Sequence, residues 1–513
     1  MMKTLKKSDL FILILFVYAL FFHLWGILQG FHLPAEGFRQ SQTAISVWAL
    51  LHGGAWFAYE TPVLGLPWSI PMEFPTYQWI VALCCAAFKT PIDETGRVIS
   101  ILSFYTCFYP VWIILKSLKI ETIYRFIFLS LFLVSPLYIL FSRDFLIEVF
   151  TVLLGFFYLA SQVRYFETQK KSVLFYCIFW GSLCAVTKVM TFAGFLSGSL
   201  ILSFYFNQNE KKLKILTHYF FKFFLIPMTF AVLWQKYSDA VKLKNPAADI
   251  IYSKNLMAWT FGSLAQRLDF LNYFGRFLFR SSMTDAVGER AFLIIAAVSF
   301  FFERRFLKPF LLLIGCYFIT TYTFISLYLV NAHGYYRTAV GFYIVFAFAY
   351  WIYGWIIQTG LKHKIGLIFL ALLTLGASYR FTDEHLTKQL HTDDKLTAFS
   401  KKIDEVSDPN GVLYITGFDW NPSIAYQARR RAHTRISLDT LKNKDASYDH
   451  YLKLKNTYPT AGLVVCANEG PFGLKKYEPL LRSLEVHEDF EFAIDDSVLE
   501  LKQYNCFFFK THS

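Results

Sequence analysis

The residues best suited to chemistry in this 513-residue sequence stand at the edges of long apolar runs. The sharpest group is Ser142-Arg143-Asp144-Phe145-Leu146-Ile147-Glu148. Asp144 and Glu148 are four residues apart, a spacing that predicts two like charges on one helical face. One carboxylate could act as a general base or bind a cation, while Arg143 could neutralise a phosphate. The alternative is a helix N-terminal charge paired with Arg143, which accounts for Asp144 better than for Glu148.

A second group, Asn331-Ala332-His333-Gly334-Tyr335-Tyr336-Arg337, combines imidazole, phenol and guanidinium donors between two apolar runs. Such donors suit phosphate recognition. The alternative is an aromatic belt with a snorkelling arginine. Lys188 stands in a tight turn between two other apolar runs, where it could pair with a lipid-linked phosphate or snorkel.

A third group lies in the long polar stretch from His32 to Gln78. Arginine, glutamine and glutamate side chains there suit sugar hydroxyls and phosphate. The alternative is a solvated loop with helix caps. The candidates in this stretch are Glu36, Arg39, Gln40, Gln42 and Glu73.

The composition indicates what surrounds these groups. Hydrophobic residues make up 55% of the chain, aromatic residues 19% and charged residues only 17%. That balance excludes a disordered chain and predicts a membrane protein. The formal net charge of +13 is spread in small groups between apolar stretches, so nucleic acid is not the expected partner.

Eleven apolar runs are long enough to be membrane helices. They lie near 10–29, 96–117, 123–141, 145–163, 173–187, 189–206, 214–235, 290–303, 306–330, 338–358 and 365–379. The positive-inside rule places six basic connections on one, cytoplasmic side: Lys3/Lys6/Lys7, Lys116/Lys119, Arg164/Lys170/Lys171, Lys211/Lys212/Lys214, Arg304/Arg305/Lys308 and Lys362/Lys364.

The N-terminus is then cytoplasmic, and segments 30–95, 236–289 and the tail 380–513 are extracytoplasmic. The run from Phe74 to Phe88 is short for a span and follows Glu73, and counting it as a crossing would invert every later loop. We expect it to be an interfacial helix, with a second, amphipathic one from Thr43 to Leu51.

The tail alternates short apolar strands with polar helical stretches and predicts a small α/β domain. The strands are Val412–Ile415 and Gly462–Cys466, and the turn from Gly417 to Pro422 opens a helix predicted over Ser423–Arg431. The eight cysteines show no metal-ligand spacing and are interpreted as small buried hydrophobic residues. No metal site is therefore assigned, and a divalent cation remains open as the only cofactor considered.

The fold class expected is an all-α polytopic membrane protein of about eleven transmembrane helices with a small C-terminal extracytoplasmic α/β domain. Residues 1–380 would form the membrane domain, with outer loops 30–95 and 236–289, and residues 381–513 the soluble domain. The location expected is a bacterial inner or plasma membrane.

Over residues 10–380 this pattern resembles the C-type superfamily of membrane glycosyltransferases. Within it the pattern is most similar to glycosyltransferase family 39, the dolichyl-phosphate-mannose protein mannosyltransferase and aminoarabinose-transferase group. Three stretches carry the resemblance: the first loop from Glu36 to Gln78, Ser142-Arg143 to Glu148, and Val186-Thr187-Lys188. The chain departs from the family in having Glu148 where Asp is common and no Asp-Glu pair in the first loop.

The resemblance implies inverting transfer of a sugar from a polyprenyl-phosphate donor to a glycan, lipid or protein acceptor on the extracytoplasmic face. Catalytic roles are expected for Glu36, Glu73 and Glu148, with Glu36 and Glu73 as rival bases. The residues expected to bind donor phosphate or substrate are Arg39, Gln40, Gln42, Arg143, Asp144, Lys188, His333, Tyr335, Tyr336 and Arg337.

Two other classes compete with this interpretation. A lipid or sugar flippase also uses many helices and intramembrane charges, but its charges usually lie near the bilayer midplane, whereas these gather at one face. A non-catalytic scaffold for envelope assembly is the other alternative. In the tail, Trp420 and Arg429 to Arg431 could touch carbohydrate, or could belong to a turn and a solvated helix end.

Overall fold

The computed structural model describes residues 7–27, 34–269, 283–288, 291–301, 304–324, 333–386, 395–436, 446–467, 478–484, 486–494 and 504–511. The chain divides into two compact units. Unit 1 comprises Met1–Gln29, Glu94–Trp234 and Met257–Leu390, and unit 2 comprises Gly30–Asp93, Gln235–Leu256 and His391–Ser513. Both stretches expected as outer loops thus contribute to the unit that contains the C-terminal residues.

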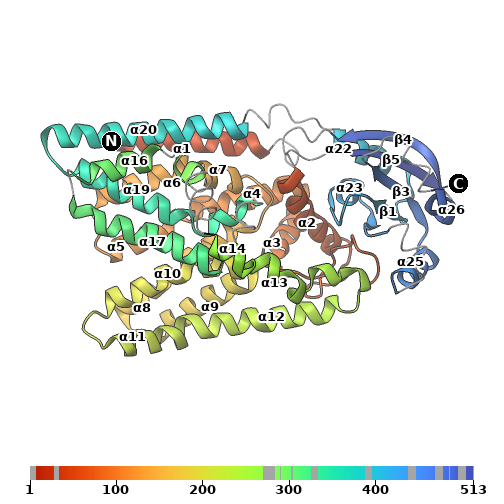
Figure 1. Cartoon of the computed structure of the whole chain (residues 1–513), viewed down its shortest axis with the longest axis horizontal. Helices are drawn as coiled ribbons and strands as arrows, with labels where there is room; N and C mark the ends of the chain where they lie inside the picture. Colours follow the sequence, from red (N-terminus) through yellow and green to blue (C-terminus); the bar gives the residue numbers. More distant parts are fainter. Residues whose placement is uncertain are drawn as a thin grey trace. The chain divides into compact units, whose positions relative to one another are not determined.

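Unit 1 is helical (Figure 1). Its helices are α1 (Lys7–Ile27), α4 (Ile92–Thr106), α5 (Phe108–Ser117), α6 (Thr122–Val134), α7 (Pro136–Ser142), α8 (Glu148–Thr168), α9 (Lys171–Thr187), α10 (Val189–Phe206), α11 (Lys212–Tyr219), the π-helix η1 (Phe220–Leu225), α14 (Leu264–Leu268), α15 (Met283–Val287), α16 (Ala291–Ser299), η4 (Arg304–Phe306), α17 (Leu307–Phe324), η5 (Gly334–Ala339), α19 (Gly341–Ile356), α20 (Gly360–Phe381) and η6 (Thr382–Leu386). Three helices have residues in both units: α4, α12 (Ile226–Lys242) and α13 (Ser253–Phe261).

Each of the eleven predicted runs contains a helix among the described residues. Six helices there are long and apolar enough to cross a bilayer, and a seventh span results if α6 and α7 count together. The apolar parts of α1, α9 and α19 are shorter, and α16 has nine described residues. The helical character of the runs is confirmed, and the number of eleven crossings stays a prediction.

The predicted run 123–141 is broken rather than straight. Its two halves, α6 and α7, meet at an angle of 57°. Ser135 between them is extended, with ψ of 119°, and Pro136 begins α7. A residue before proline is pushed out of the helical region, and proline is well accommodated in a first helical turn. The Ser-Pro pair therefore ends one helix and starts the next.

Close packing in unit 1 fixes the short helix η5 against α10. A Cβ atom on Gly194 of α10 would lie 2.1 Å from the Ala339 carbonyl oxygen. The Tyr343 hydroxyl donates to the Gly194 carbonyl at 2.9 Å and accepts from the Gly198 amide at 2.8 Å. Both hydrogen bonds hold α19 to α10, because a tyrosine hydroxyl can donate and accept at once.

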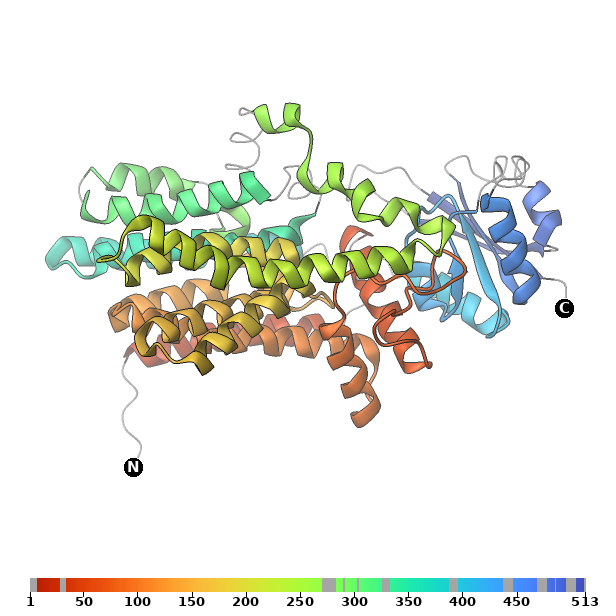
Figure 2. The same ribbon diagram turned by 90° about the horizontal axis from the view of Figure 1, so that it is seen from below.

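Unit 2 contains a five-stranded sheet in the order β2-β1-β3-β5-β4. The strands are β1 (Val412–Thr416), β2 (Arg431–His433), β3 (Thr460–Ala467), β4 (Val486–Ile494) and β5 (Tyr504–Thr511), and the helices are α2 (Pro34–Leu51), α3 (Thr76–Phe88), η2 (Pro246–Ile251), α22 (Lys395–Val406), α23 (Ser423–Gln427), α25 (Ala446–Thr457) and α26 (Glu478–Leu484). Strands β2, β1 and β3 are parallel, whereas β5 is antiparallel to β3 and β4. The blue sheet and its neighbouring helices are visible in Figures 1 and 2, and the α/β character predicted for the tail is confirmed.

The first outer loop contacts the β2 edge of this sheet. The Ala432 amide donates to the Pro62 carbonyl at 2.8 Å, and the Thr434 amide donates to the Val63 carbonyl at 3.0 Å. Asn245, from the second loop, donates from its amide to the Gly65 carbonyl at 3.1 Å and the Pro67 carbonyl at 3.0 Å. The otherwise open strand edge is thus paired with other parts of unit 2.

One hydrophobic core joins three segments that are far apart in sequence. Val63 and Ile70 come from the first loop, Ile251 from the second, and Leu413 and Phe508 from the sheet, all with at most 4% of their surface exposed. Burial of these side chains together makes the two loops and the C-terminal residues one folded body.

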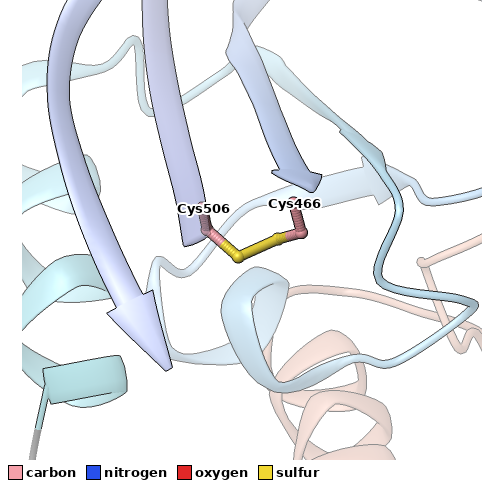
Figure 3. Close-up of a disulfide and its surroundings, with 2 residues drawn as sticks. All are labelled: Cys466 and Cys506. Carbon is pink, nitrogen blue, oxygen red and sulfur yellow. A yellow bond between two sulfur atoms is a disulfide. The ribbon is translucent and has the colours of Figure 1, made fainter. Parts of the chain in front are cut away.

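A disulfide joins Cys466 on β3 to Cys506 on β5 (Figure 3). The two residues are directly opposite each other in the antiparallel pair. The prediction that all eight cysteines are isolated buried thiols is therefore wrong for these two. Forty residues separate them, so their proximity depends on strand pairing that spacing alone does not reveal.

Two predicted boundaries also change. The helix predicted over Ser423–Arg431 ends at Gln427 as α23, because Arg429 takes a left-handed backbone with φ of 52° and Arg431 begins β2. The helix predicted over Thr43–Leu51 begins nine residues earlier, at Pro34, as α2.

Candidate active site

The stretch from Arg143 to Glu148 joins α7 to α8, and it is not one helix. Residues 143–147 bend between the two helices, and α8 begins at Glu148. The prediction that Asp144 and Glu148 share a helical face is therefore wrong. Glu148 lies in the first turn of α8, where the helix dipole favours a negative charge, and Asp144 lies outside the helix.

Glu148 forms a buried ion pair with Lys188. The Lys188 ammonium donates to Glu148 Oε1, and the two side chains are 6% and 0% exposed. No described residue donates a hydrogen bond to the other carboxylate oxygen, Oε2. A buried charge is stable only when paired, so removing either partner leaves the other uncompensated.

Lys188 reaches this position because it interrupts two helices. It ends α9 and precedes α10 with an extended backbone, φ −160° and ψ 98°. The interruption was predicted as a tight turn. It projects an ammonium group from a stretch that is otherwise apolar.

Two tyrosines of η5 surround the same ammonium group. Lys188 Nζ lies 4.9 Å from the ring centroid of Tyr335 and 4.8 Å from that of Tyr336. The His333 ring stacks on Tyr335 at 5.4 Å. The two distances from the ammonium group to the tyrosine rings are in the range of cation–π attraction. The structure thus brings together three segments that are far apart in sequence. They contribute Glu148, Lys188, and the group His333, Tyr335 and Tyr336.

Arg337 in η5 pairs with Asp285, which precedes the end of α15. Their side chains are 11% and 17% exposed. The sequence indicated Arg337 but missed Asp285, which lies in an outer loop without a local motif. The sequence shows an acidic residue in that loop, but its pairing with Arg337 depends on the folded structure.

Asp144 and Arg143 belong to a buried charge group that also includes Arg97 of α4. Arg97 and Arg143 are each 2% exposed, and Asp144 is 7% exposed. Burial raises the pKa of the Asp144 carboxyl, and the positive charges of Arg143 and Arg97 oppose that shift. Arg97 was not among the predicted residues, although an arginine at the start of an apolar run is a signal that could have found it.

The charged side chains around Asp144 and around Glu148 interact with one another within unit 1. Glu148 also raises the pKa of Asp144, so the two carboxylates interact across the bend. Three cations, Lys188, Arg143 and Arg97, lie among these two carboxylates. The excess positive charge and the tyrosine and histidine donors suit an anionic group such as a phosphate.

The remaining candidates lie in unit 2. Arg39 of α2 donates to the Gln42 side-chain oxygen at 2.6 Å and forms an ion pair with Glu73. Gln40 is also on α2 and is 1% exposed. Glu36 lies near the start of α2, and its side chain is outside the described part of the structure.

The arginines of the tail are held by structural contacts. Arg430 is 3% exposed, and its guanidinium pairs with Asp404 at 2.7 Å and donates to the Ser407 carbonyl at 2.9 Å. Arg431 pairs with Glu60 at 2.9 Å and lies over the Trp68 ring. These contacts favour the structural interpretation of Arg430 and Arg431 over carbohydrate binding.

A metal ion would need several donor side chains close together among the described residues. Among them, no three His, Cys, Asp or Glu side chains are grouped closely enough to hold a metal ion.

Comparison with known proteins identifies the fold. No protein-family model matches the chain, and no curated protein sequence matches it. ArnT from Cupriavidus metallidurans, solved bound to undecaprenyl phosphate, is similar with a TM-score of 0.63 and 12% identity, over 97% of this chain and 97% of that one. The oligosaccharyltransferase of Archaeoglobus fulgidus in its apo form has a TM-score of 0.51 and 12% identity, over 96% of this chain and 75% of that one.

The arabinofuranosyltransferase AftD from Mycobacteria has a TM-score of 0.50 and 11% identity, over 98% of this chain and 40% of that one. The chain therefore shares its fold with these three glycosyltransferases. The predicted resemblance to the C-type superfamily is confirmed at the level of the fold.

Proposed function

We propose that the protein is a membrane glycosyltransferase that moves a sugar from a polyprenyl-phosphate-linked donor to an acceptor hydroxyl on the extracytoplasmic face, with inversion. The observation that carries the proposal is the buried Lys188–Glu148 pair with Tyr335 and Tyr336 around the ammonium. ArnT, which has the same fold, was solved with undecaprenyl phosphate bound. A glycan, a lipid or a protein of the cell envelope is the proposed acceptor.

The reaction needs a cationic site for the leaving group. The acceptor oxygen attacks the anomeric carbon of the sugar, and the bond between that carbon and the phosphate oxygen breaks. The electron pair of that bond leaves with the polyprenyl phosphate, and the acceptor proton passes to a carboxylate base. Negative charge therefore grows on the phosphate in the transition state, where fixed cations stabilise it most.

We assign the leaving phosphate to Lys188, with His333, Tyr336 and Arg337 as further donors. Lys188 must keep its charge and its position while buried, and Glu148 provides both through the ion pair. Glu148 is then a positioning residue that acts through Lys188. Because the Glu148 Oε1 atom already accepts a hydrogen bond from the Lys188 ammonium group, we assign the base to another residue.

The base is proposed from the first outer loop, Glu36 or Glu73. Glu73 forms an ion pair with Arg39 of α2. This assignment comes from the family resemblance of the loop, and replacement of each acid separately by glutamine would distinguish the two.

Two features of unit 2 support the proposed orientation in the membrane. Its shared core requires both outer loops and the C-terminal residues to be on one side. The predicted runs satisfy this requirement, because six lie between the first and second loops and four between the second loop and the tail, both even numbers. The Cys466–Cys506 disulfide favours an oxidising, extracytoplasmic compartment for that side.

The proposal is tested by incubating the purified protein with polyprenyl-phosphate-linked sugars and envelope acceptors and measuring the donor by mass spectrometry. We expect the wild type to consume a donor and Glu148→Gln to lose at least about 100-fold in rate, the scale of removing a transition-state charge contact. Glu167→Gln is the matched control, because Glu167 is on the same helix and pairs with the exposed Arg164.

Equal rates in wild type and Glu148→Gln would contradict the assigned site. An unchanged donor pool with every sugar and acceptor would contradict the enzyme itself and favour a flippase or a scaffold.

A further inference from the structure

A polar pocket lies in unit 1, at the end of α8 opposite Glu148. It has a volume of about 260 Å³ and is lined by side chains of α8, α10, α11 and η1. Its polar lining includes Tyr165, Asn207, Lys214, His218, Tyr219 and Lys222. Nothing in the reaction proposed above uses these residues.

The pocket is one bilayer thickness away from the candidate active site. Glu148 is the first residue of α8, and Tyr165 and Gln169 of the pocket lie 17 and 21 residues later. At 1.5 Å per residue this is about 25 to 30 Å, the thickness of a hydrocarbon core. The pocket therefore belongs to the opposite, cytoplasmic membrane boundary.

Lys222 is the central cation of this pocket. Its ammonium donates to the Tyr165 hydroxyl at 3.1 Å and lies 5.5 Å from the centroid of that ring. Among the described residues, Lys214 has a carboxylate partner, Glu210, at 2.8 Å, but no carboxylate forms an ion pair with Lys222. A half-buried lysine in a candidate membrane helix needs an anionic partner or an aqueous exit.

The backbone around Lys222 is held in an unusual form. Lys222 lies in the π-helix η1, a geometry often found at functional sites. Pro227 follows, and it has no N–H to offer the Phe223 carbonyl four residues earlier. The Tyr158 hydroxyl donates to that carbonyl at 3.0 Å, and the Tyr219 hydroxyl donates to the Leu196 carbonyl at 3.0 Å. Both bonds fix the wall of the pocket.

We infer that this pocket binds the phosphate of an anionic lipid headgroup at the cytoplasmic boundary. Lys222 and Lys214 supply positive charge, and Asn207 and His218 supply neutral polar groups, against one carboxylate, Glu210. The helix formed by α11, η1 and α12 has only 22% of its apolar window buried, so a lipid can approach the pocket from the bilayer.

The test measures thermal unfolding of the full-length protein in detergent during titration with phosphatidylglycerol, phosphatidylcholine or inorganic phosphate. Ligands that bind the folded state raise its midpoint temperature. We expect phosphatidylglycerol to raise the midpoint of the wild type and of Lys222→Arg, and Lys222→Met to lose most of that rise. Lys214→Met is the second pocket variant and should lose part of it.

Lys171→Met is the matched control, since Lys171 is an exposed lysine at the same boundary outside the pocket. An equal rise in wild type and both pocket variants, or an equal loss in Lys171→Met, would overturn the site. A full rise with inorganic phosphate alone would overturn the lipid as its source, and a full rise with phosphatidylcholine would overturn the selectivity for anionic headgroups. Because binding is read without turnover, failure here is distinguishable from failure of the proposed reaction.

Discussion

At the scale of residues, the proposed reaction depends on one lysine held by one carboxylate and two phenol rings. Lys188 and Glu148 are both buried, so each is costly without the other. The tyrosines add attraction for the ammonium and exclude water from it. The arrangement keeps a charged, oriented donor within an apolar bundle.

Because Lys188 and Glu148 depend on each other, we expect the rate losses from replacing them not to be additive. Lys188→Met should abolish turnover, and in the Glu148→Gln background it should cost little more, because both changes remove the same oriented charge. Lys188→Arg retains the charge. We expect it to have a raised KM for the donor and a kcat between those of the wild type and Lys188→Met. Initial rates over a donor titration check this, with Lys170→Met, at an exposed position, as control. Fully additive losses in the double variant would contradict a shared role.

The site could be predicted from the sequence only in part. Ionisable residues in apolar surroundings stand out without a structure, so Arg143, Glu148, Lys188 and Arg337 were found. Their partners were not, because the Lys188–Tyr335 contact and the Arg337–Asp285 pair join distant segments. The assignment of Asp144 and Glu148 to one helix failed because periodicity does not reveal where a helix begins.

At the scale of elements, helix breaks position the chemistry. The bend between α7 and α8 places Asp144 and Glu148, and the break between α9 and α10 places Lys188. Apolar runs predicted the helices well, since hydrophobic length is a strong signal. The strand edge formed with the first loop and the disulfide could not be predicted, because both depend on long-range pairing.

The break at Pro227 predicts a stabilising role for Tyr158. Tyr158→Phe removes the donor to the Phe223 carbonyl, and leaving a buried carbonyl unsatisfied costs about 1 to 3 kcal/mol. We expect a lower midpoint of thermal unfolding for this variant. Tyr176→Phe, at an exposed position on α9, should leave the midpoint unchanged. Equal midpoints for wild type and Tyr158→Phe would contradict this role.

In unit 2, a buried histidine pair predicts a pH dependence of stability. Burial, together with His450 and Arg435, lowers the pKa of His433 to about 3, below its ordinary value of 6.5. The unfolded chain then binds more protons between these values, so His433 makes stability fall as pH drops below 6.5, by up to about 1.4 kcal/mol per pH unit. His433→Gln should shrink the loss of midpoint temperature between pH 7.5 and pH 5. An unchanged loss would exclude His433 as its source.

At the scale of the whole molecule, the chain alternates between two units. The first loop, the second loop and the C-terminal residues share one core, although long helical stretches separate them in sequence. This arrangement constrains the topology more strongly than charge bias does, because every stretch between those segments must cross the membrane an even number of times.

The topology is tested by cysteine labelling with a membrane-impermeant maleimide in intact cells. Asn410→Cys lies in an exposed turn of unit 2 and should be labelled directly. Gln208→Cys lies in an exposed turn after α10 and should be labelled only after permeabilisation. The wild type provides the background from its six free cysteines. Labelling of both positions in intact cells would contradict the proposed crossings.

The proposed reaction transfers a sugar and releases the lipid phosphate. The most direct measurement follows both products by mass spectrometry, free polyprenyl phosphate and glycosylated acceptor, from one purified preparation. The account predicts that the two appear in equal amounts in the wild type and that both disappear in Lys188→Met. Lipid phosphate without a glycosylated acceptor, or equal product from Lys188→Met, would contradict it.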